Sequence, residues 1–172
     1  MFQDEGRFGR ISDPRRCWGP APVRPVVRAA LVREYLYAYS ALSPWDARLD
    51  SLVLPDASTA CMNVFLDEIT KRYPDELIVM VLDGAGWHRS GTLAVPDNMA
   101  LLPLPPYAPE LNPVELLWAE LREKSFHNRV FNSLDAVEDQ LCEALRTLEN
   151  DRQRVGRLVG STWLTKLNLN AK

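Results

Sequence analysis

The sequence predicts an α/β fold in which a mixed central sheet is flanked by helices. Three observations support this prediction. Three segments typical of strands occupy the first third of the chain, a continuous apolar run (LIVMVL, 77–82) follows a helical pattern, and two more helical patterns come after it. Strands joined by short turns pair antiparallel, whereas a strand that follows a crossover helix normally lies parallel to an earlier one. The sheet is therefore expected to contain both kinds of pairing.

The first third of the chain is predicted to form an antiparallel meander. Its three strands are expected at Phe2–Phe8, Tyr35–Leu42 and Leu49–Leu54. The stretch Gly9–Pro25 is rich in Gly, Pro and Arg, and is therefore predicted to be a loop.

The elements that follow alternate between helices and strands. A helix capped by Ser58 or Thr59 is expected to run to Tyr73, with apolar residues at helical spacing. The run 77–82 has the composition of a strand buried on both faces. A short strand is expected at Met99–Leu104, and helices are expected at Pro113–Lys124 and Ser133–Leu148.

Length and composition indicate one soluble domain spanning residues 1–172. Apolar residues make up 47% of the chain and charged residues 25%, as is ordinary for a globular protein. No apolar run approaches the roughly 18 residues of a membrane span, and the first residues do not resemble a signal peptide. Cys17, Cys61 and Cys142 are far apart and lack paired spacing, which favours a reducing cytoplasm over a disulfide framework or a zinc site.

The charge distribution leaves nucleic-acid binding open. A net charge of -3 counts against it, because domains that bind nucleic acid are usually basic. Residues 1–34, however, hold seven Arg against two Asp and two Glu, a local net charge of +3 (7 minus 4).

Asp83 directly follows the buried run and precedes Gly84. Ligands of open α/β sheets bind outside the carboxyl ends of parallel strands, where a carboxylate is well placed for a metal ion. The alternative is an Asp-Gly turn without any function.

Glu115 also has two interpretations. Asn112 is a good helix N-cap and Pro113 suits the first helical position, so Glu115 could reach back to the amide of the cap. Glu115 also lies at the edge of the apolar stripe of its predicted helix, from where it could point into a cleft.

The remaining candidates are weaker on their own. Asp4 and Glu5 are neighbours on a predicted strand and must face opposite sides of the sheet, so only one can join a given site. Both could equally be solvated edge charges. His88 could contact phosphate or transfer a proton, or it could be structural, and His127 has less support.

Three motifs together resemble the DDE transposases, in particular the bacterial insertion-sequence branch of the mariner superfamily. FQDEGRF (2–8) is similar to the motif around the first catalytic Asp of that family, and VMVLDGAGWHRS (79–90) is similar to the motif around the second. LPPYAPELNPVELLW (104–118) resembles the third and most specific motif, whose glutamate corresponds to Glu115.

The resemblance implies a ribonuclease H-like fold, which the order of the predicted elements matches. It further implies that Asp4, Asp83 and Glu115 are the catalytic residues and hold Mg²⁺, with Mn²⁺ as a substitute. Two ions about 4 Å apart can stabilise the attacking and leaving oxygens of a phosphodiester. The expected partner is DNA, both transposon ends and target, with no membrane involved, and the active complex is expected to be a homodimer.

The resemblance also defines the expected reaction and its alternatives. We expect hydrolysis at the transposon end followed by strand transfer. Relatives have helix-turn-helix DNA-binding segments before the first Asp; these are absent here, so the chain is expected to be a truncated product, one half of a split reading frame, or an expressed catalytic domain. The alternatives are a ribonuclease H-like nuclease without strand transfer and an inactive transposase remnant.

Overall fold

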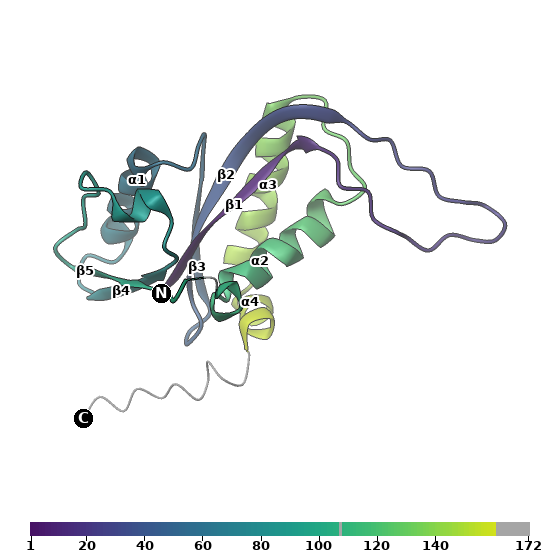
Figure 1. Ribbon diagram of the computed structural model, residues 1–172. Helices are drawn as coiled ribbons and strands as arrows, with labels where there is room; N and C mark the ends of the chain where they lie inside the picture. Colours follow the sequence, from purple (N-terminus) through teal and green to yellow (C-terminus); the bar gives the residue numbers. More distant parts are fainter. Residues whose placement is uncertain (107, 161–172) are drawn as a thin grey trace.

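A five-stranded mixed sheet forms the centre of the molecule, and helices cover both of its faces (Figure 1). The computed structural model describes residues 1–106 and 108–160. The strands lie in the order β3-β2-β1-β4-β5. Strands β1 (Phe2–Ile11), β2 (Leu31–Ser43) and β3 (Arg48–Leu54) form an antiparallel meander, while β4 (Ile78–Leu82) pairs parallel to β1, and β5 (Met99–Pro103) to β4. The predicted mixed α/β sheet is confirmed.

The hairpin of β1 and β2 is longer than predicted. Strand β1 continues to Ile11, inside the stretch expected to be loop, and β2 begins at Leu31, before the predicted start at Tyr35. Gly9 signals a close approach of two strands here, because a Cβ at this position would lie 2.3 Å from the carbonyl oxygen of Glu34. The connection from 12 to 30 projects away from the sheet as a long arm (Figure 1).

Two apolar cores lie on opposite faces of the sheet. Helix α1 (Thr59–Arg72) packs on one face through Met62, Phe65, Leu66 and Ile69. The other face is covered by α2 (Val114–Leu121), α3 (Leu134–Glu149) and α4 (Arg152–Val159), which lie together on that side in Figure 1.

Several local predictions about the helices can be checked directly. The Oγ of Ser58 accepts a hydrogen bond from the Cys61 amide, which confirms Ser58 as the cap of α1. Helix α2 ends earlier than predicted, at Leu121, and the chain continues as a π-helical turn, η3 (Arg122–Phe126). Helix α4 was not predicted.

No helix in the described part of the chain is long and apolar enough to cross a membrane.

Strand β4 is not buried on both faces as predicted. Ile78, Met80 and Leu82 are buried under α1, but Val79 is 47% exposed and Val81 is only partly covered. The reason is that α2, α3 and α4 pack mainly against the meander, so one face of the sheet is left partly open at β4. The candidate active site lies beside this opening.

Candidate active site

Asp4 lies on β1, and Asp83 immediately follows the neighbouring parallel strand β4. The register of β1 and β4 places Phe2 opposite Val81, an offset of 79 residues, and the same offset relates Asp4 to Asp83. Phe2 and Val81 both belong to the core under α2, and side chains alternate along a strand, so Asp4 also faces α2. Two aspartates that are distant in sequence are therefore brought to the same edge of the sheet.

Trp118 of α2 holds the carboxylate of Asp4. Its indole Nε1 donates a hydrogen bond of 2.8 Å to Asp4 Oδ2. The indole lies against Gly6, where a Cβ would come within 2.7 Å of Trp118 Cδ2, so a larger residue two positions after Asp4 would displace it. The predicted helix at Pro113–Lys124 contains Trp118, but this polar contact was not predicted from the sequence. The indole N–H, which needs a partner when buried, was the available signal.

Asp83 lies immediately after β4, and its side chain is 53% exposed. Its Oδ1 accepts a hydrogen bond of 2.9 Å from the Ala85 amide, which is the pattern of an Asx turn. The turn interpretation is thus correct as a description of the backbone. It does not compete with a functional role, because the same turn fixes the carboxylate at the strand end.

Glu115 is exposed near the start of α2. The helix begins at Val114, one residue later than predicted, and Asn112 Oδ1 accepts from the Val114 amide. A capping glutamate would accept from the Asn112 amide, but that amide donates to the carbonyl of Pro109. The capping interpretation of Glu115 is therefore wrong.

The three predicted carboxylates line one open cleft of about 470 Å³. Asp4 comes from β1, Asp83 from the end of β4 and Glu115 from α2. Prolines that precede α2, namely Pro105, Pro106 and Pro109, also line the cleft. The lining residues are Asp4, Asp83, Gly84, Leu104, Pro105, Pro106, Ala108, Pro109, Asn112 and Glu115. Tyr107 of the third motif lies outside the described residues.

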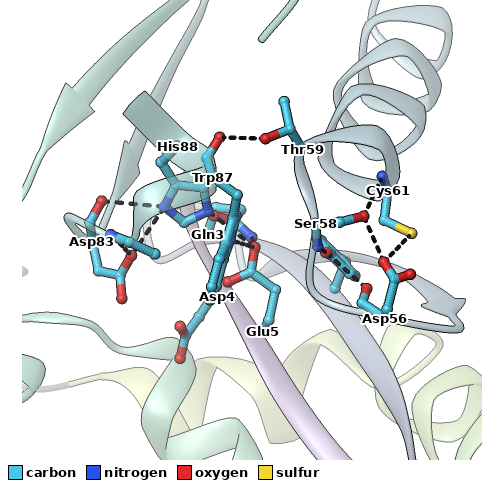
Figure 2. Close-up of polar contacts among 12 residues, drawn as sticks. Gln3, Asp4, Glu5, Asp56, Ser58, Thr59, Cys61, Asp83, Trp87 and His88 are labelled. Carbon is cyan, nitrogen blue, oxygen red and sulfur yellow. Dashed lines mark hydrogen bonds and ion pairs between the residues drawn. The ribbon is translucent and has the colours of Figure 1, made fainter. Parts of the chain in front are cut away.

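Glu5 faces away from the cleft, as alternation along β1 predicted. Its Oε1 accepts hydrogen bonds from Gln3 Nε2 at 3.0 Å and Trp87 Nε1 at 3.3 Å, and it contacts His88 Nε2 at 3.0 Å. Figure 2 shows these side chains gathered around one carboxylate. Glu5 is therefore not a solvated edge charge, since its side chain is only 5% exposed.

His88 lies between two carboxylates and does not reach the surface. Its Nδ1 is 2.9 Å from Asp83 Oδ1 and its Nε2 is 3.0 Å from Glu5 Oε1, with 1% of the side chain exposed. Burial lowers the pKa of His88, but hydrogen bonds to Asp83 and Glu5 and the charge of Glu5 outweigh it and raise the pKa to about 9. A phosphate contact by this ring, one of the predicted alternatives, is wrong because both nitrogens are already engaged.

Comparison with known proteins identifies the family. The family model described as DDE superfamily endonuclease matches residues 1–138. The chain belongs to the DDE superfamily of endonucleases. A relative in Sinorhizobium fredii, the uncharacterized protein y4pE/y4sA, is 39% identical over 115 residues, which are 66% of this chain and 85% of that protein.

Solved structures confirm the fold of this family member. The Mos1 transposase paired-end complex with left transposon end matches with a TM-score of 0.60 and 16% identity over 93% of the chain. The Mos1 mariner paired end complex with Mn matches with a TM-score of 0.62 and 15% identity over 95%. The predicted ribonuclease H-like fold is therefore correct. The chain spans 55% and 54% of the two Mos1 chains, about half of their length.

The chemistry of the cleft fits a divalent cation. Carboxylate oxygens are the hard ligands that Mg²⁺ and Mn²⁺ prefer, and the cleft gathers three of these groups. As the side chains lie in this structure, no three His, Cys, Asp or Glu among residues 1–106 and 108–160 are grouped closely enough to hold a metal ion. Glu115 is exposed, and exposed side chains change rotamer within nanoseconds, so its carboxylate can turn toward Asp4 and Asp83 when a cation binds.

Asp4 shows the electrostatic consequence of grouping these acids. Burial raises its pKa most, the hydrogen bond from Trp118 lowers it, and the charges of Glu115 and Glu5 raise it further, to about 7. A carboxylate whose ionisation is this unfavourable is one that a bound cation would stabilise.

This pKa predicts that Asp4→Asn stabilises the protein in metal-free buffer above pH 7. The pKa of Asp4 is higher in the folded protein than in the unfolded chain, so the neutral carboxyl favours folding. This stabilisation is fully present below pH 3.8 and is lost as the pH rises to about 7. At pH 8 the variant should therefore be more stable by about 2–4 kcal/mol, with a much smaller gain near pH 4.5. Urea unfolding with EDTA at both pH values measures the difference. Equal gains at both pH values would contradict the assignment of the pKa to Asp4.

Proposed function

We propose that this chain is the catalytic domain of a DNA transposase of the bacterial insertion-sequence branch of the mariner superfamily. The observation that supports it best is the shared cleft of Asp4, Asp83 and Glu115 on a ribonuclease H-like sheet. We propose that these three residues are catalytic and would hold Mg²⁺, with Mn²⁺ able to replace it. The described residues would belong to a single catalytic domain that acts as a homodimer.

The reaction would be an in-line displacement at phosphorus. Water adds its oxygen to the phosphorus at the transposon end as the P–O3′ bond breaks, which leaves a 3′-hydroxyl and a 5′-phosphate. The 3′-hydroxyl oxygen then forms a bond to a target phosphorus as the bond to the target 3′-oxygen breaks. When bound, the metal ions would supply Lewis-acid stabilisation of the attacking and leaving oxygens.

The residues of the cleft would have separate tasks in this reaction. Asp4 would be held in place by the N–H of Trp118, and Asp83 by the turn that follows β4. Asn112 binds both the carbonyl of Gln3 on β1 and the amide of Val114 on α2. It would therefore fix the start of α2, and with it Glu115, relative to the strand of Asp4.

The arm between β1 and β2 is the surface best suited to the DNA backbone. It presents exposed arginines, and guanidinium groups bind phosphate well without reading base sequence. The end of β1, Ile11, is seven positions after Asp4, about 23 Å at the usual rise of a strand, so the arm would bind DNA away from the scissile bond. The exposed arginines from the arm to the start of β2 are Arg15, Arg16, Arg24, Arg28 and Arg33.

Metal-dependent cleavage and joining of DNA test the proposal. With Mg²⁺ or Mn²⁺, the protein should cut supercoiled plasmid and should join a duplex with a free 3′-hydroxyl to plasmid DNA. Ca²⁺ should support neither reaction, because its longer bonds and higher coordination number do not suit two-metal geometry. An excess of EDTA is the control. Cleavage without joining would support a nuclease instead, and equal activity with EDTA would contradict the proposal.

A further inference from the structure

The bridge that His88 forms between Glu5 and Asp83 has no place in the reaction described so far. We propose that Glu5 and His88 are positioning residues that fix the carboxylate of Asp83 in the cleft. This inference rests on the proposed function, because it assigns a task to residues around the proposed metal site.

The bridge joins two strands near the end of their backbone pairing. The register of β1 and β4 is defined at Phe2 opposite Val81, and β4 ends at Leu82. Glu5 and Asp83 lie beyond these positions. In Figure 2 the His88 ring lies between their two carboxylates, with a dashed contact to each. The imidazole therefore connects the strands where the backbone ladder has ended.

Both nitrogens of the His88 ring are engaged at once. Nε2 lies 3.0 Å from Glu5 Oε1, and Nδ1 lies 2.9 Å from Asp83 Oδ1. Because the ring is planar and only 1% of the side chain is exposed, the two contacts fix its position and orientation. Such a ring suits a fixed support for Asp83.

The bridge is itself anchored on the side away from the cleft. Glu5 accepts hydrogen bonds from Gln3 and Trp87 in addition to its contact with His88. The carbonyl of Trp87, in the 3₁₀ turn η1 (Gly86–Arg89), accepts from Thr59 Oγ1 at the start of α1 at 3.3 Å. Contacts therefore connect Thr59 of α1 to η1, and the ring of His88 in η1 to Asp83. Asp83, half-exposed at a strand end, is held by groups that are themselves buried.

Two isosteric substitutions separate the halves of the bridge. The amide nitrogen of Asn overlays Nδ1 of histidine, so His88→Asn keeps a donor toward Asp83 and loses the contact with Glu5. The amide nitrogen of Gln overlays Nε2, so His88→Gln keeps the donor toward Glu5 and loses the one toward Asp83. His127→Gln is the matched control, because His127 is also largely buried against a carboxylate, that of Glu123, and does not line the cleft.

The experiment measures Mn²⁺ affinity by calorimetry, the kcat and KM of plasmid cleavage, and Tm for each variant. Groups that support a metal ligand typically change affinity or activity 10–100-fold, so His88→Gln should lose about 10-fold or more in Mn²⁺ affinity and in kcat. KM for DNA should stay within about twofold, since the residue does not touch DNA. His88→Asn should recover part of both losses, and His127→Gln should match the wild type.

The result separates this inference from the proposed function. A wild-type protein that binds no Mn²⁺ and cuts no DNA would overturn the proposed function. A wild type that does both, with all His88 variants within about twofold of it, would overturn the positioning role alone. Equal losses in His88→Asn and His88→Gln that follow the fall in Tm would also overturn it, because they would indicate a role in folding only.

Discussion

Replacing Asp83 by Asn should abolish metal-dependent cleavage while the protein stays folded. The change removes one negative charge at nearly constant shape, and Asn can still accept the hydrogen bond from the Ala85 amide that forms the turn. An amide is a poor ligand for Mg²⁺ compared with a carboxylate. Loss of one ligand should lower the cleavage rate on the order of a thousandfold, equivalent to about 4 kcal/mol of transition-state stabilisation. A plasmid cleavage assay measures the rate, and circular dichroism measures whether the variant is folded.

Asp67→Asn is the matched control for this prediction. Asp67 lies on α1, on the opposite face of the sheet from α2, and forms an exposed ion pair with Lys71. Exposed pairs of this type contribute little to stability, so the control should cut DNA at the wild-type rate. If Asp83→Asn also retained that rate, Asp83 would be a turn residue without a role in catalysis.

Glu115→Gln should have an effect of similar size on cleavage, on the order of a thousandfold, for the same chemical reason. Gln and Glu have similar helix propensities, so α2 should form normally. The expected stability change is small, within about 0.5 kcal/mol, because Glu115 is exposed and does not accept from the amide of Asn112.

The control here is Glu123→Gln, which removes an exposed glutamate paired with His127 after the end of α2. Its cleavage rate should equal that of the wild type. The opposite pattern for Glu115→Gln, with full activity and a clear loss of stability, would indicate that Glu115 acts only on the helix end.

The sequence predicted the positions of residues correctly where the local order of apolar and polar residues determines the structure. The apolar run before Asp83 predicted a strand and a carboxylate at its end, and both lie where expected. The alternation of Asp4 and Glu5 predicted opposite faces of the sheet, which the contacts of Trp118 and Glu5 confirm. These predictions depend only on backbone periodicity, which is visible in a single sequence.

Contacts between distant segments could not be predicted in the same way. The bridge of His88 to Glu5 joins residues 83 positions apart, and the hydrogen bond from Trp118 to Asp4 joins residues 114 apart. No local pattern encodes such pairs, because they depend on how β1, β4 and α2 pack. Gly9 was predicted to lie in a loop for the same reason. A glycine in a loop cannot be distinguished in sequence from a glycine that lets a neighbouring strand approach closely.

A crystal soaked in Mn²⁺ tests most directly whether Asp4, Asp83 and Glu115 form one metal centre. An anomalous difference map locates the manganese without reference to the protein atoms. We expect peaks in the cleft, with oxygens of Asp4, Asp83 and Glu115 as ligands and the Glu115 side chain turned toward Asp4. Manganese bound elsewhere on the chain, with the cleft empty in crystals that cut DNA when dissolved, would contradict the proposed centre.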